Sequence, residues 1–286
     1  MNNFNFVKMN CLGNDFVIIN RSDLDFEISP QFAKQIAQRH TGVGCDQILL
    51  FESVDKANNI FDFQIFNADG SQSEQCGNGA ICTANLIYDR QYANAASSVM
   101  LRTSAADMRC HLSERCGVSA ELGIPTFIPS EIPFLADDEQ IQYELSDVKV
   151  DGKPIQVCVL AIGNPHAVTL VSDADAAAVR KVGRKVESHR RFPHRVNVEF
   201  MQVVSRERIY LRVFERGVGE TWACGSGSSA AVAAGRRLGL LDESVTVKVK
   251  AGEVGVNWKG PGTPVSLTAP ASYVFEGRWG NDIAAS

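Results

Sequence analysis

The sequence predicts an α/β protein built from two duplicated halves, and the clearest evidence is a cysteine motif that occurs twice. Ile65–Gly79 reads IFNADGSQSEQCGNG, and Val213–Gly227 reads VFERGVGETWACGSG. In each copy a phenylalanine closes an apolar strand, a cysteine follows ten positions later, and Gly-x-Gly leads into a run of small residues. Cys76 and Cys224 lie 148 positions apart. We therefore expect each cysteine where a turn opens a helix.

Two further pairs of segments repeat at nearly the same distance. Leu12–Ile18 (LGNDFVI) resembles Ile162–Val168 (IGNPHAV), and Gln47 corresponds to Asn197, both at a spacing of 150. A period this long excludes a solenoid and fits two halves of one molecule, each the size of an ordinary domain.

Hydrophobic periodicity predicts the elements of each half. Several apolar segments alternate with a period of two, as strands buried on one face do; the predicted strands include 17–19, 48–51, 61–66, 157–160, 200–204 and 209–214. Residues 30–39 and 174–182 are amphipathic and predict outer helices. Residues 79–88 and 228–238 are small or apolar on nearly every side, which predicts a buried central helix in each half.

The domain boundaries are predicted from proline-rich connections. Gly123–Pro133 contains three prolines and is the candidate crossing, and a return near Ala269–Pro270 would let the C-terminal tail rejoin the first half. We expect a first domain of residues 1–121 plus 270–286, which carries Cys76, and a second of residues 122–269, which carries Cys224.

Composition narrows the class of protein. The chain has 286 residues, 45% of them hydrophobic, and a net charge of −5 with both signs interspersed, so neither a nucleic-acid partner nor a membrane is expected. The first residues lack a secretory signal pattern. The eight cysteines are therefore expected to be reduced thiols in a cytoplasmic protein.

The Cys-Gly-x-Gly motif combines an acid–base group with an anion-binding site. A cysteine at a helix N-terminus is expected to have a pKa below its free value of about 8.5. Glycines let the backbone approach a ligand closely, and the free N–H groups of a first helical turn can hold a carboxylate.

Two such motifs suit the inversion of a carbon that bears an acidic hydrogen. One thiolate would remove the proton from one face while the other thiol delivers a proton to the opposite face, and the pair would titrate together. The sequence has no phosphate-binding glycine loop and no local indication of pyridoxal phosphate, so no cofactor is expected. Cys110, His111 and Cys116 lack a fourth ligand at zinc spacing, so no metal is expected.

The motifs resemble those of the diaminopimelate epimerase family. The resemblance extends from near Phe6 to about Phe275, and the matching segments are 12–16, 42–47, 66–71, 75–80, 163–166, 195–198, 215–217, 219–221 and 223–227. It implies two pseudosymmetric domains, each a curled, mostly antiparallel sheet around a central helix, with the active site between them. It also implies cofactor-independent interconversion of LL- and meso-2,6-diaminopimelate for lysine and cell-wall precursor synthesis, and a homodimer.

The resemblance also implies a role for each matching residue. Cys76 and Cys224 would be the catalytic acid–base pair. The reacting end of the substrate would be surrounded by Asn14, Gln47, Gly77, Asn78, Glu215, Gly225 and Ser226. The distal end would be bound by Asn67, Asn164, Asn197 and Arg216. A guanidinium can bind a carboxylate through two hydrogen bonds, and an amide can accept from an ammonium and donate to a carboxylate. His166 would support the site.

Three departures from the family pattern leave other functions open. They are Asn10-Cys11 in place of His-Gly, Ile81 in place of arginine, and Ala251-Gly252-Glu253 in place of Pro-Gly-Gly. One alternative is a racemase of another amino acid, such as histidine or proline. A second is a non-catalytic binder or a thiol redox protein. Cys82 and Cys158 are expected to fill core space, and Asn14 and Asn164 could be turn formers.

Overall fold

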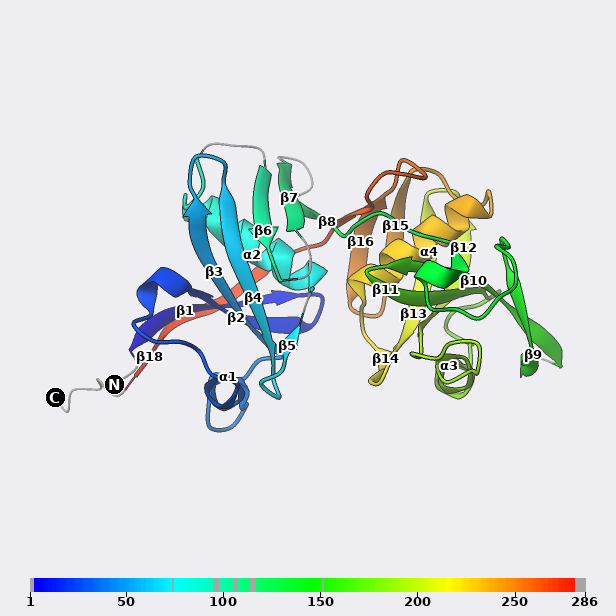
Figure 1. Ribbon diagram of the computed structural model, residues 1–286, viewed down its shortest axis with the longest axis horizontal. Helices are drawn as coiled ribbons and strands as arrows, with labels where there is room; N and C mark the ends of the chain where they lie inside the picture. Colours follow the sequence, from blue (N-terminus) through cyan, green and yellow to red (C-terminus); the bar gives the residue numbers. More distant parts are fainter. Residues whose placement is uncertain are drawn as a thin grey trace. The chain divides into compact units, whose positions relative to one another are not determined.

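The chain divides into two compact units. One runs to Ala120 and takes in the chain again from Thr268, and the other is Glu121–Leu267. The computed structural model describes residues 3–73, 75–94, 98–104, 107–113, 117–150 and 152–280 (Figure 1).

The first unit contains a sheet around one long helix. Within its described residues the elements are β1 (Phe4–Cys11), β2 (Asn14–Asn20), α1 (Pro30–Ala37), β3 (Gln47–Asp55), β4 (Ile60–Asn67), β5 (Gln72–Ser73), α2 (Gly77–Asp89), β6 (Ser98–Arg102), β7 (Asp107–Ser113), β8 (Gly117–Glu121) and β18 (Ser272–Trp279), with a 3-10 turn at Arg21–Asp23. The strands pair in the order β18-β1-β2-β3-β4-β6-β7-β8, and β5 adds a short pairing to β4. The β2–β3 and β4–β6 pairs are parallel, and the others are antiparallel.

The second unit repeats this arrangement. Its described elements are β9 (Tyr143–Val150), β10 (Lys153–Ile162), β11 (Asn164–Leu170), α3 (Val179–Glu187), β12 (Asn197–Ser205), β13 (Arg208–Glu215), β14 (Gly219–Thr221), α4 (Gly225–Arg237), β15 (Ser244–Val249), β16 (Gly252–Asn257) and β17 (Ser266–Thr268), with a 3-10 turn at Pro129–Glu131. The order β9-β10-β11-β12-β13-β15-β16 matches β18-β1-β2-β3-β4-β6-β7 strand for strand, with parallel pairs at the corresponding places. The predicted duplicated, mostly antiparallel fold is confirmed.

The two central helices are buried as their composition predicts. In α2, nine of the thirteen residues from Gly77 to Asp89 are buried, and α4 also buries nine of its thirteen residues. Strands of its own unit surround each helix (Figure 1). Small residues permit this packing because they let the strands approach the helix closely on several sides.

The outer helices cover the opposite faces of the sheets. Helix α1 begins as predicted, since Pro30 is its first residue and the Ser29 side chain accepts the N–H of Phe32 at 3.2 Å. The prediction for residues 174–182 is partly wrong, because α3 begins only at Val179. Asp173 accepts the backbone N–H groups of Asp175 and Ala176, which fixes a turn there instead of a first helical turn.

Candidate active site

Each cysteine of the repeated motif caps a central helix. The Cys76 side chain precedes α2 and its Sγ accepts the N–H of Gly79 at 3.3 Å, while Cys224 precedes α4 and accepts the N–H of Gly227 at 3.4 Å. The seven described cysteines all carry reduced thiols. Only these two are partly exposed; the buried ones are Cys11, Cys45, Cys82, Cys110 and Cys158. The two predicted acid–base residues are thus the partly exposed cysteines of the described chain.

In the first unit, three predicted amide ligands lie at the ends of neighbouring strands. Gln47 and Asn67 face each other across β3 and β4, and Gln47 Nε2 donates to Asn67 Oδ1 at 2.9 Å. Asn67 Nδ2 donates in turn to the hydroxyl of Ser71 at 3.0 Å. Asn14 Nδ2 donates to Asp46 Oδ2 at 3.0 Å. Each amide is therefore held in one orientation.

Two predicted site residues of this unit each have a buried side-chain oxygen with no hydrogen-bond partner among the described residues. These oxygens are Gln47 Oε1 and Asn78 Oδ1, and Asn78 lies beside Gly77 in the first turn of α2. A buried acceptor without a donor costs free energy, roughly 1–3 kcal/mol. Both residues were predicted to bind the reacting end of the substrate, and an ammonium group is a donor suited to such oxygens.

Among the predicted distal ligands of the second unit, Asn197 forms side-chain hydrogen bonds to the backbone at Arg216 and Pro165. Its Oδ1 accepts the backbone N–H of Arg216 at 2.9 Å, and its Nδ2 donates to the carbonyl of Pro165 at 3.2 Å. The Arg216 side chain is exposed and donates to the carbonyl of His194 at 3.2 Å. Asn197 fixes the backbone at Arg216, and the guanidinium remains accessible to a carboxylate.

The environment of Cys224 contradicts the predicted low pKa for this thiol. Burial and the adjacent Glu215 carboxylate raise the pKa of Cys224 well above its ordinary value, although the N–H of Gly227 and the hydroxyl of Ser226, 3.5 Å from Sγ, act in the opposite direction. Burial also raises the pKa of Glu215, whose Oε1 accepts the Thr221 hydroxyl at 2.5 Å. Desolvation and a nearby negative charge thus raise the pKa of Cys224 by more than the helix N-terminus lowers it.

His166 is fully buried and lies between two side-chain oxygens. Its Nδ1 is 2.7 Å from Glu199 Oε1, and its Nε2 is 2.8 Å from Asn164 Oδ1. The sequence prediction included His166 and Asn164 but missed Glu199. A signal existed, because at the spacing of 150 that pairs Gln47 with Asn197, Glu199 corresponds to the apolar Leu49.

The predicted site residues fall into two sets, one in each unit. The first unit holds Asn14, Gln47, Asn67, Cys76, Gly77 and Asn78; the second holds Asn164, His166, Asn197, Glu215, Arg216, Cys224, Gly225 and Ser226. Gly77 and Gly225 are the first residues of α2 and α4.

The departures from the family motifs lie in packing positions and on the surface. Ile81 is fully buried in α2. Cys11 is buried and contacts the buried thiol of Cys82, whose pKa is raised by this neighbour and by burial. Glu253 forms an ion pair with Arg208. Cys158 is also buried, so the core roles predicted for it and for Cys82 are confirmed.

The described residues contain no group of three or more histidine, cysteine, aspartate or glutamate side chains that could hold a metal ion. Cys116 lies outside the described residues. Among the helices of the described chain, none is both long and apolar enough to cross a membrane.

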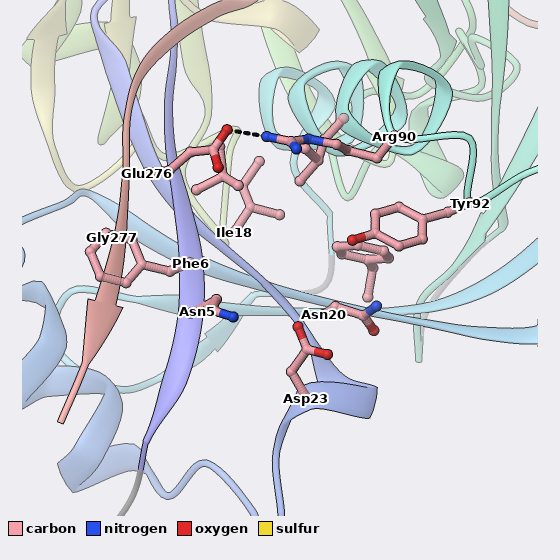
Figure 2. A pocket seen from close by; sticks show the side chains of 12 residues that line it. Asn5, Phe6, Ile18, Asn20, Asp23, Arg90, Tyr92, Glu276 and Gly277 are labelled. Carbon is pink, nitrogen blue, oxygen red and sulfur yellow. Dashed lines mark hydrogen bonds and ion pairs between the residues drawn. The ribbon is translucent and has the colours of Figure 1, made fainter. Parts of the chain in front are cut away.

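A pocket of 440 Å³ in the first unit lies away from these residues. Strands β1, β2 and β18 and the C-terminal end of α2 line it, and an ion pair between Arg90 and Glu276 crosses it (Figure 2). No predicted site residue contributes to its lining.

Solved structures define the class of fold. The chain resembles a phenazine biosynthesis protein of the PhzF family from Bacillus anthracis, with a TM-score of 0.67, 16% identity and coverage of 98% of this chain and 99% of the other. It also resembles a hydroxyproline epimerase from Agrobacterium vitis, with a TM-score of 0.65, 12% identity and coverage of 96% and 92%. The chain thus shares its duplicated fold with these two proteins.

Sequence comparison then identifies the family. The diaminopimelate epimerase family model matches residues 6–128 and 158–274. A diaminopimelate epimerase from Teredinibacter turnerae is 44% identical over 273 residues, covering 96% of this chain and 98% of the relative. One from Pseudomonas entomophila is 42% identical with the same coverage. The chain belongs to the diaminopimelate epimerase family and is an isomerase.

Proposed function

We propose that the protein interconverts LL- and meso-2,6-diaminopimelate by a two-base mechanism without a cofactor. One observation carries the proposal: the family-specific motif puts a partly exposed cysteine at the N-terminus of a buried helix in each duplicated half. The reaction would serve lysine and peptidoglycan precursor synthesis.

The thiols would act from opposite faces of one α-carbon. Burial and Glu215 favour the protonated form of Cys224, so Cys224 would be the first proton donor and Cys76 the first base. Their roles would exchange for the opposite substrate configuration. Negative charge develops on the α-carboxylate as the proton leaves. The first-turn N–H groups of α2 and α4, next to Gly77 and Gly225, would stabilise that charge.

The distal ligands would select a substrate with a second amino-acid head. Asn67, Asn164 and Asn197 offer amide groups, and Arg216 offers an accessible guanidinium. Amides can bind an ammonium and a carboxylate, and a guanidinium can bind a carboxylate with two parallel hydrogen bonds. A monocarboxylic amino acid with one ammonium has no second head for these groups to bind.

Hydrogen exchange in deuterated water tests this choice of substrate. The purified protein is incubated with LL-diaminopimelate, meso-diaminopimelate, histidine and proline, and deuterium at the α-carbon is followed by NMR. We expect exchange and epimerisation with diaminopimelate alone. Exchange with histidine or proline and none with diaminopimelate would identify a racemase of another amino acid. No exchange with any of them would favour a non-catalytic binder or a thiol redox protein.

We further propose a cytoplasmic homodimer whose ligand is this small amino acid, with no nucleic-acid or membrane partner. A surface that suits a second copy is the outer strand β18, where Tyr273, Val274 and Phe275 are 41%, 55% and 47% exposed in succession. Consecutive exposed apolar side chains on an edge strand favour association. Sedimentation equilibrium should give twice the chain mass, and the chain mass alone would contradict the dimer.

A further inference from the structure

A buried carboxylate lies beneath the first turn of α4. The Glu199 side chain projects from β12 and is fully buried. A Cβ atom added to Gly227 would lie 3.0 Å from Glu199 Oε1 and 3.4 Å from Cys224 Sγ. Glu199 Oε1 also lies 2.7 Å from Nδ1 of the fully buried His166. Burying these groups carries a desolvation penalty that a hydrocarbon pair would not have.

The first half of the chain shows that the fold does not need this polar pair. In the parallel pair β2–β3 Phe16 lies opposite Gln47, and in β11–β12 His166 lies opposite Asn197. Leu49 lies two residues after Gln47, as Glu199 lies two residues after Asn197.

Leu49 occupies the same place as Glu199 relative to its helix. Its Cδ1 lies 3.1 Å from a Cβ added to Gly79, just as Glu199 lies against Gly227. Phe16 and Leu49 are both fully buried. The duplicated architecture therefore accepts an apolar pair at positions where the second half keeps a histidine and a glutamate.

The hydrogen bonds around His166 fix where its protons lie. A neutral imidazole beside an ionised Glu199 would leave a net negative charge in a fully buried site, so the pair is most stable with one further proton. Burial accordingly raises the pKa of Glu199. Whether that proton sits on the carboxyl or on Nδ1, the other ring nitrogen, Nε2, carries a hydrogen.

The protonated Nε2 determines how the amide of Asn164 is turned. Nε2–H donates to Asn164 Oδ1 at 2.8 Å, so the amide oxygen faces the histidine and the NH₂ group faces away from it. This NH₂ is a donor suited to a carboxylate. If Nε2 lost its hydrogen, the amide would turn to donate to it and would offer an oxygen, which repels a carboxylate.

We propose that Glu199 is a positioning residue that keeps a proton on His166 Nε2 and thereby turns the Asn164 amide to donate to a carboxylate of the substrate. The role of Asn164 rests on the proposed function. The other titratable groups that bear on the pair are Glu215 from β13 and Cys224 from the start of α4. Neither donates to Glu199 Oε2, which has no partner in the described chain.

Two variants separate positioning from packing. Glu199→Gln keeps the size of the side chain but cannot hold the additional proton. Glu199→Leu places there the residue that the first half uses. Glu220→Gln is the matched control, because its side chain is 5% exposed in the same unit and forms ion pairs with Arg212, Lys250 and Arg180.

The substrate-independent measurement is ¹⁵N NMR of labelled histidine between pH 6 and 9. We expect the Nε2 of His166 to carry a hydrogen in the parent and in Glu220→Gln, as its hydrogen bond to Asn164 Oδ1 requires. In Glu199→Gln, the Nε2 proton should be lost from a substantial fraction of the molecules near pH 8. An unchanged His166 spectrum in Glu199→Gln would overturn the proposal.

The kinetic measurement is the KM and kcat of diaminopimelate epimerisation. We expect KM to rise about tenfold or more in Glu199→Gln and in Glu199→Leu, with a smaller change in kcat. The melting temperature of Glu199→Leu should stay at or above that of the parent, since an apolar pair is tolerated in the duplicate. Full activity of the folded Glu199→Leu protein would show that Glu199 only fills space. If the parent turned over another amino acid instead, the NMR result would still decide the role of Glu199.

Discussion

The two duplicated cysteines share a helix-capping position but not the same surroundings. The first turn of α2 packs on Leu49, whereas that of α4 packs on Glu199 with Glu215 close by. A fold that began as two equal halves therefore supplies unequal environments to its two thiols. Such a difference suits an enzyme in which one thiol is a base while the other is an acid.

The first prediction concerns the charge beside Cys224. Glu215→Gln removes a negative charge that disfavours the thiolate, so the pKa of Cys224 should fall and the thiolate should form at lower pH. Iodoacetamide labelling of Cys224, read by peptide mass spectrometry, should be roughly fivefold faster at pH 8 in the variant. An equal or slower rate would contradict the electrostatic role of Glu215. Labelling of Cys76 in the same samples controls for differences in reagent concentration and activity.

The duplication identified candidate site residues that have a counterpart in the other copy, the family resemblance added His166 and Arg216, and neither identified Glu199. Cys76, Cys224, Gln47 and Asn197 are visible because each has a counterpart. Glu199 has no such counterpart, and its signal is only that a charged residue stands where the other copy has the apolar Leu49. The raised pKa of Cys224 depends on burial and on Glu215, which only three-dimensional packing reveals.

At the scale of elements, the central helices were predictable and one outer helix was not. Small and apolar residues on every side identify α2 and α4 as buried. The start of α3 depends on the Asp173 side chain, which accepts backbone N–H groups and turns the chain before Val179. Hydrophobic periodicity alone does not detect a turn that competes with the first turn of a helix.

The second prediction concerns how α3 packs on β13. A Cβ added to Gly183 would lie 2.6 Å from Cγ of Phe214, too close without movement of the helix. Gly183→Ala should therefore destabilise the protein by about 1–3 kcal/mol in urea unfolding. Lys185→Ala, at an exposed position of the same helix, should stay within about 0.5 kcal/mol. Equal stability of Gly183→Ala and the parent would refute this packing.

At the scale of the whole molecule, the duplication predicted the fold. An offset of 148 relates the cysteine motifs and one of 150 relates the Gly-Asn turns and the polar strand ends. The strand orders of the two units also match. The path of the C-terminal strand back to the first unit follows from β18 pairing with β1. The sequence indicates this return of the chain only weakly, because a proline near residue 270 predicts a turn but does not show which strand the following segment pairs with.

The central claim is that one thiol from each half acts on the same α-carbon. Epimerisation of LL-diaminopimelate by Cys76→Ala and by Cys224→Ala tests it most directly, with Cys158→Ala as a buried-cysteine control. We predict that each catalytic variant loses about 1000-fold or more in kcat while Cys158→Ala stays active. Turnover within about tenfold of the parent by either Cys76→Ala or Cys224→Ala would contradict the two-base account.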